Sequence, residues 1–168
     1  MQHLIIIPGI SDSTKKLTLI TKNWDKKYGI HPHILKFGWQ GDDKNLNSRL
    51  KMIGKHIDNL LNDGKDVSLL GTSAGGSAVI NLFYPRRNKI NKVINVCGQL
   101  SDSKNIMTYK KTDDIALYTA SVAKCEKIIS KLSYKDMKKI LTIKPIFDDV
   151  VPIRTMIIDC AVNKRIFA

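Results

Sequence analysis

The stretch VSLLGTSAGG, residues 67–76, decides the fold. Its first half is a compact apolar run typical of a buried strand, and the run AVINLF at 78–83 predicts a helix that Pro85 limits. Between them, Gly71, Ser73 and Gly75 satisfy the pattern G-x-S-x-G. A strand that turns sharply into a helix around a serine presents that hydroxyl as a nucleophile.

The small residues of this turn have physical reasons to be there. A nucleophile on such a turn has a strained backbone, so Gly71 and Gly75 give clearance to the neighbouring strand and helix. The N–H of Ala74 and the positive end of the helix point to where an oxyanion forms. Taken alone, GTSAGG also fits a plain glycine-rich turn or a phosphate-binding loop. Neither a Walker lysine nor G-x-G-x-x-G accompanies it, which argues against a nucleotide site.

Length and composition indicate an ordinary globular protein. The chain has 168 residues, of which 43% are hydrophobic and 26% charged, and this is enough for one domain with a sizeable core. No apolar stretch approaches the roughly 20 residues of a membrane-spanning helix, and the opening apolar run ends at Pro8 without a basic leader. We therefore expect no membrane span and a cytoplasmic location.

Cysteine usage and charge limit the partners. The three cysteines are far apart and form no C-x-x-C pair, so we expect no disulfide, no metal and no cofactor. The formal net charge of +13 is of a kind that attracts nucleic acid. The lysines that supply most of it form no dense block and accompany no recognised nucleic-acid-binding module, so we expect no specific nucleic-acid partner. The oligomeric state is not indicated.

Apolar strand patterns alternate with amphipathic helix patterns along the chain. Helices are predicted from about Ser13 to Gly29, from Leu46 to Gly64 and after the GTSAGG turn. Strands are predicted over residues 2–7, 31–37, 66–70, 92–96, 140–146 and 164–167.

Residues 101–138 are predicted to form a mostly helical connection over the site, with a short helix capped by Ser133 and Asp136. The alternation as a whole predicts a single α/β domain over 1–168, with a mainly parallel sheet flanked by helices. Ligands of such sheets bind beyond the carboxyl ends of the strands.

With these features the sequence resembles the α/β-hydrolase family, particularly its small single-domain serine hydrolases, over nearly its whole length. A second match is IFDDVVP, residues 146–152, where the family places the acid of its triad shortly before a Val-Pro pair. The resemblance implies Asp148 as this acid, with Asp149 as the alternate. A third match is IIIPGISDS, residues 5–13, where the family places its second oxyanion N–H, here that of Ile10.

The sequence departs from the family at the general base. The resemblance predicts a histidine after the acid, and no histidine follows Asp148. Family members usually carry it just beyond the strand that NKRIFA, residues 163–168, resembles, so we expect a chain truncated at its C-terminus. No other histidine is expected to substitute, because three lie at or near strand starts and one on the solvated face of a helix. These are His3, His31, His33 and His56.

Two hypotheses follow. The first is a serine hydrolase that cleaves a small-molecule ester, thioester or amide through an acyl-Ser73 intermediate, with Asp148 orienting a base outside this sequence. The second is a catalytically inactive hydrolase-like domain that binds a ligand or a protein in the same cleft. The substrate is not indicated, although pocket walls are expected from Trp39, Tyr109 and Tyr118.

Overall fold

In the computed structural model, which describes residues 1–105 and 115–167, six parallel strands form one sheet in the order β2-β1-β3-β4-β5-β6. The expected parallel sheet is therefore confirmed, and β3, which precedes the glycine-rich turn, lies in its middle. The strands are β1 (Gln2–Ile7), β2 (Ile30–Ile34), β3 (Asp66–Thr72), β4 (Val93–Val96), β5 (Ile140–Pro145) and β6 (Val162–Ile166).

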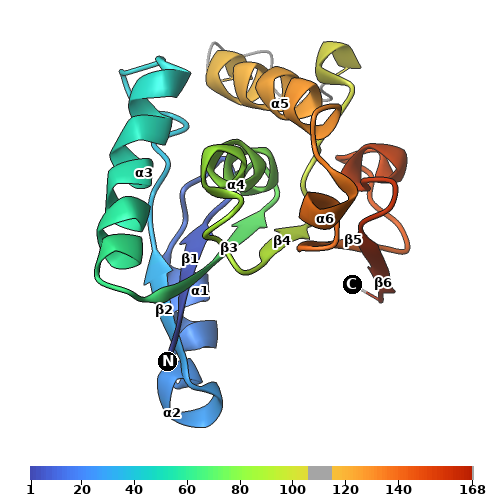
Figure 1. Cartoon of the computed structure of the whole chain (residues 1–168). Helices are drawn as coiled ribbons and strands as arrows, with labels where there is room; N and C mark the ends of the chain where they lie inside the picture. The colour runs from blue at the N-terminus through green and yellow to red at the C-terminus, as the bar shows by residue number, and fades with distance from the viewer. Residues whose placement is uncertain (106–114, 168) are drawn as a thin grey trace.

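Helices flank this sheet, as expected. Figure 1 shows α4 and α5 above the sheet in that view and α3 at its left, with α1 and α2 lower down near β1 and β2. The α-helices of the described residues are α1 (Lys15–Thr21), α2 (Trp24–Tyr28), α3 (Leu46–Asn62), α4 (Gly75–Phe83), α5 (Ala116–Ile129) and α6 (Tyr134–Met137).

The core is built around α4, which lies between the sheet and helices α3 and α5. Every residue of α4 is buried, and α3 turns a stripe that includes Leu50, Ile53 and Ile57 towards it. On the sheet, Ile5 and Leu69 are fully buried in the same cluster. Burying one such side chain contributes about 1.5–3 kcal/mol, so this packing fixes the position of the turn that precedes α4.

Two local predictions were wrong. The single helix expected from Ser13 to Gly29 is two short helices, because Leu19 and Ile20 of α1 are exposed and no continuous apolar stripe holds the segment against the sheet. The strand expected over 31–37 ends at Ile34. The Leu35 N–H still donates to Ile6 O of β1, but the N–H groups of residues 37–39 bond to the Asp12 side chain instead of a neighbouring strand.

Other boundaries were predicted correctly. Helix α3 begins after Asn45, whose side chain accepts hydrogen bonds from the backbone of the first turn, and Gly64, just beyond its end, has a left-handed φ of 71°. The capping box of Ser133 and Asp136 is formed. In the helical connection, α5 and α6 are present, while residues 106–114 lie outside the described part.

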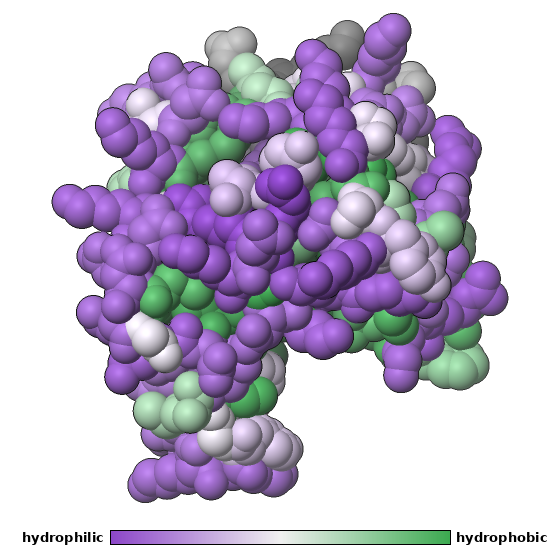
Figure 2. Space-filling view, in the orientation of Figure 1, coloured by the Kyte–Doolittle hydropathy of each residue, from purple (hydrophilic) through white to green (hydrophobic). Residues whose placement is uncertain are grey.

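The surface is dominated by charged and polar side chains. Figure 2 shows hydrophilic residues over most of the visible face, with smaller hydrophobic areas between them. At one edge of the sheet, all five residues of β6 are exposed. Within residues 1–105 and 115–167, no helix has the length and apolarity needed to cross a membrane.

Candidate active site

Ser73 lies at the sharp turn between β3 and α4. Its φ of 51° is in the left-handed region, and its side chain is exposed while Ala74, the next residue, is 2% exposed. Two hydrogen bonds hold this conformation: the Ser73 N–H donates to Val96 O at 2.9 Å, and the Gly76 N–H donates to Ser73 O at 2.9 Å. The serine hydroxyl is thus presented at the carboxyl end of a central strand.

The two glycines of the motif occupy places where no side chain fits. A Cβ on Gly71 would overlap the carbonyl group of Gly75, and a Cβ on Gly75 would overlap the carbonyl group of Ile7. The backbones of β1, β3 and α4 therefore meet at van der Waals distance around Ser73. This is the clearance that the sequence pattern predicts.

The loop after β1 passes beside the serine. A Cβ on Gly9 would lie 3.1 Å from Ser73 Cβ and 3.5 Å from Ser73 Oγ. Ile10 follows and is half-buried against the core. Within residues 1–105 and 115–167, neither the Ile10 N–H nor the Ala74 N–H donates to another backbone group outside the regular helices and strands.

Asp148 follows the end of β5 and is half-buried, whereas Asp149 is exposed. The Asp148 carboxylate accepts hydrogen bonds from the N–H groups of Val150 at 2.9 Å and Val151 at 2.8 Å. Burial, and then the negative charge of Asp148, raise the pKa of the Cys97 thiol, which follows β4. The charge of Asp148 therefore acts at the end of β4, the strand next to that of Ser73.

Asn95 of β4 supports the turn around Ser73, a role that no pattern in the sequence indicates. The buried Asn95 side chain donates to Gly98 O at 2.9 Å and to Met156 O at 3.1 Å. A Cβ on Gly98 would overlap both Asn95 Oδ1 and Ser73 O. Asn95 thus fixes the segment that packs against the backbone of the serine, and only the tertiary structure shows it.

The four histidines lie together, far from Ser73. His3 Nδ1 and His33 Nε2 are 2.9 Å apart, His33 Nδ1 and His56 Nε2 are 3.2 Å apart, and the ring of His31 is 4.9 Å from that of His33. His3 pairs with Val67, which lies at the opposite end of β3 from Ser73. Roughly 20 Å of extended strand separates Val67 from Ser73.

One of these histidines, His56, lies in a different environment from the one predicted. His56 is not on a solvated face: it is half-buried, and its ring is hydrogen-bonded to that of His33 on β2. Burial, and then the neighbouring histidines, lower the pKa of His33 to about 4. Among the described residues, no group of three or more His, Cys, Asp or Glu side chains is placed to hold a metal ion.

The expected pocket walls are part of the core. Trp39 is 0% exposed and Tyr118 is 6% exposed, so the prediction that they line an open pocket was wrong. Trp39 stacks on Phe37, with ring centroids 4.1 Å apart, and its Nε1–H donates to Pro8 O at 3.2 Å. Tyr109 lies outside the described residues.

Solved structures with similar folds include lipolytic enzymes. Est1E from Butyrivibrio proteoclasticus matches with a TM-score of 0.71 at 17% identity, over 99% of this chain and 77% of that one. A structure from the metagenome-derived lipolytic enzymes LipS and LipT matches with a TM-score of 0.73 at 11% identity, over 99% and 82%. A lipase-esterase related protein from Clostridium acetobutylicum matches with a TM-score of 0.69 at 13% identity, over 98% and 84%.

No protein-family model matches the chain, and no curated protein does. At these identities the structural likeness is evidence about the fold alone.

Proposed function

Because the chain has the α/β-hydrolase fold, we propose that it is a serine hydrolase acting on small-molecule esters, thioesters or amides. Ser73 Oγ attacks the carbonyl carbon, the leaving group departs, and water then hydrolyses the acyl-serine intermediate. The observation that carries the proposal is the exposed Ser73 at φ 51° between β3 and the buried helix α4. The esterase and lipase neighbours support it.

In this proposal the oxyanion of the tetrahedral intermediate accepts hydrogen bonds from the N–H groups of Ala74 and Ile10. The first lies at the N-terminal end of α4, where the helix dipole adds positive potential, and the second lies in the loop that passes Ser73. In enzymes of this kind, losing one such donor lowers kcat about 100- to 1000-fold.

The proposal assigns Asp148 to orient an imidazole that takes the proton of Ser73. None of the four histidines is placed to do this: His3 pairs with Val67 at the far end of β3, and the other three gather beside it on edge strand β2 and helix α3. A histidine encoded after residue 168 would supply the base. Without one, Ser73 reacts slowly, because removing the histidine of a serine triad costs on the order of a millionfold in kcat.

A fluorophosphonate probe tests the proposal. We expect the chain to be labelled at Ser73, slowly in plain buffer and faster with added imidazole, which replaces the missing base from solution. Intact-mass spectrometry measures the labelled fraction, and Ser73→Ala is expected to remain unlabelled. A chain extended through a downstream histidine should react without imidazole. No labelling of wild type under any of these conditions would refute the proposal.

A second candidate function is a ligand-binding domain without turnover. The distance between Ser73 and all four histidines favours it. In this case small carboxylic acids or esters bind, as measured by calorimetry, while neither imidazole nor extension of the chain produces labelling. For either function we propose a cytoplasmic location, which suits the free cysteines Cys97, Cys125 and Cys160.

A further inference from the structure

We propose that Asp12 is a positioning residue for the oxyanion site: its carboxylate holds the loop that carries Ile10 in place beside Ser73. This inference rests on the proposed function, which needs the Ile10 N–H as a donor. Asp12 itself touches neither the serine nor a substrate, so its effect must pass through the loop.

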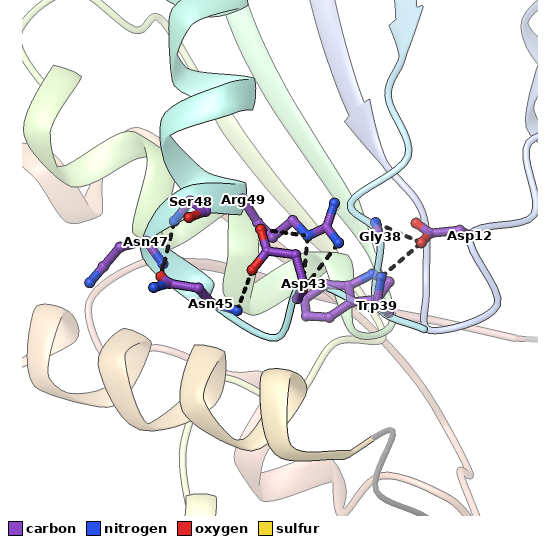
Figure 3. A network of polar contacts seen from close by, with 8 residues as sticks. All are labelled: Asp12, Gly38, Trp39, Asp43, Asn45, Asn47, Ser48 and Arg49. Carbon is purple, nitrogen blue, oxygen red and sulfur yellow. Dashed lines mark hydrogen bonds and ion pairs between the residues drawn. The ribbon is translucent and has the colours of Figure 1, made fainter. Parts of the chain in front are cut away.

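The Asp12 carboxylate accepts three backbone hydrogen bonds from the loop after β2. Oδ1 accepts from the Phe37 N–H at 2.8 Å, and Oδ2 accepts from the N–H groups of Gly38 at 2.7 Å and Trp39 at 2.9 Å. Figure 3 shows this carboxylate turned towards Gly38 and Trp39. Hydrogen bonds to an ionised acceptor are about twice as strong as neutral ones, so the two loops are joined firmly.

The loop that receives Asp12 is itself fixed to α3. Arg49 of α3 donates to Asp43 O from Nε at 3.2 Å and from Nη2 at 3.1 Å. Its guanidinium also fills the space beside two glycines: a Cβ on Gly38 would lie 2.8 Å from Arg49 Cζ, and one on Gly41 would lie 2.7 Å from Nη2. As Figure 3 shows, Arg49 and Asp12 approach this turn from different elements, so the turn connects α3 to the loop after β1.

Two contacts then transmit this support to the residues beside the serine. The Asp12 N–H donates to Gly9 O at 2.9 Å, and the buried Trp39 Nε1–H donates to Pro8 O at 3.2 Å. Ile10 therefore lies in a short loop that is held on both sides. Asp12 has a φ of 48°, a conformation that Asp and Asn adopt more readily than most side chains.

Loss of the carboxylate is expected to move the Ile10 N–H without unfolding the chain. Displacing a group by about 1 Å in an active site can cost about 100-fold in rate. For Asp12→Ala we expect the rate constant of phosphonylation at saturating probe to fall about 10- to 100-fold, with the half-saturating probe concentration unchanged. Asp12→Asn keeps one carbonyl acceptor and the backbone preference, so it should lie between wild type and Asp12→Ala.

The experiment follows fluorophosphonate labelling of the full chain in imidazole buffer by intact mass, over a range of probe concentrations. The matched control is Asp58→Asn. This substitution breaks the ion pair between Asp58 of α3 and Arg86 in the segment after α4, which includes hydrogen bonds of 2.6 and 2.7 Å. This variant loses a comparable carboxylate contact and should label at the wild-type rate. If Asp12 only stabilised the fold, both Asp12→Ala and Asp58→Asn would lower the fraction of chain that can be labelled, and the rate constant of phosphonylation would be unchanged.

Hydrogen exchange gives a readout that does not depend on reactivity. In Asp12→Ala the amide of residue 12, which donates to Gly9 O, should exchange faster, while those of residues 67–76 keep their protection. Unchanged exchange at residue 12, or a wild-type rate constant in a folded Asp12→Ala chain, would overturn this inference alone. No labelling of wild type would overturn the proposed function and this inference with it.

Discussion

At the scale of single residues, the backbone of Ser73 is under strain that its neighbours maintain. A left-handed φ, here 51°, costs a non-glycine residue about 1–2 kcal/mol. The conformation persists because β3 and α4 meet at this residue with glycines packed against backbone on both sides. The strain places the hydroxyl outside regular secondary structure, where a substrate can reach it.

The clearance at Gly75 predicts a large effect of one added methyl group. For Gly75→Ala we expect the free energy of unfolding to fall by about 3 kcal/mol, because the new Cβ would meet the carbonyl groups of Ile7 and Pro8, with Pro8 O at 2.9 Å. Alanine would otherwise favour this helical position. Urea unfolding followed by circular dichroism measures the change.

Gly29→Ala is the matched control. Nothing lies within 4 Å of a Cβ at Gly29, and its φ of 67° alone should cost about 1 kcal/mol. Equal losses for the two variants would mean that the backbones around Ser73 can separate at little cost.

At the scale of elements, a chain of histidines joins β1, β2 and α3. His33 on β2 lies between His3 of β1 and His56 of α3, and its two ring nitrogens approach one nitrogen of each. A neutral His33 ring can donate from one nitrogen and accept at the other, so it can complete both contacts at once. The burial that lowers the pKa of His33 is therefore also the packing that attaches edge strand β2 to α3.

This arrangement predicts a loss of stability in mild acid. Unfolded His33 binds a proton below pH 6.5, whereas the folded pKa is about 4, so the unfolded state holds more protons between these values. The His33 contribution is complete above about pH 6.5 and declines as the pH falls towards 4. His3, whose pKa is lowered by burial and then by His31 and Lys65, acts in the same direction.

Urea unfolding at pH values from 7.0 to 4.5 measures the effect. For a half-exposed ring, solvent screening reduces the His33 contribution to about 1–2 kcal/mol. His33→Gln should flatten the pH dependence over this interval. A variant with the wild-type slope would show that His33 is not the group responsible.

At the scale of the whole molecule, positive charge is in large excess. Lys and Arg number 28 against 15 Asp and Glu, and the face in Figure 2 is mostly hydrophilic. Such an excess keeps a protein soluble and also destabilises its compact state through self-repulsion. Salt screens this repulsion over a Debye length of about 10 Å at 0.1 M.

We therefore expect the chain to become more stable as salt is added. Between about 20 and 200 mM sodium chloride at pH 7, the free energy of unfolding should rise by up to about 1 kcal/mol, because repulsion among surface lysines is screened. Urea titrations at each salt concentration measure the change, with sucrose at matched osmolality as a control for non-ionic effects. A fall in stability would show that favourable ion pairs outweigh the repulsion.

The sequence by itself determined the succession of elements and the turn around Ser73. Strand and helix periodicities, caps such as Ser133 and the spacing of Gly71 and Gly75 depend on residues that are close in the chain, so they can be recognised without a fold. Alternating strands and helices then predict a parallel sheet, because a parallel pair needs a crossover between its strands. The first helix was mistaken because local periodicity does not show which apolar residues find a surface to pack on.

Only the tertiary structure decided which distant residues meet. Asp12 bonds to a loop 25 residues away, His3 meets His33 across 30 residues, and Trp39 enters the core where an open pocket wall was expected. Such contacts depend on how strands are ordered and how helices pack, which no local pattern encodes. The order β2-β1-β3 brings the loop after β2 to the loop beside Ser73, and this long-range proximity creates the support that Asp12 provides.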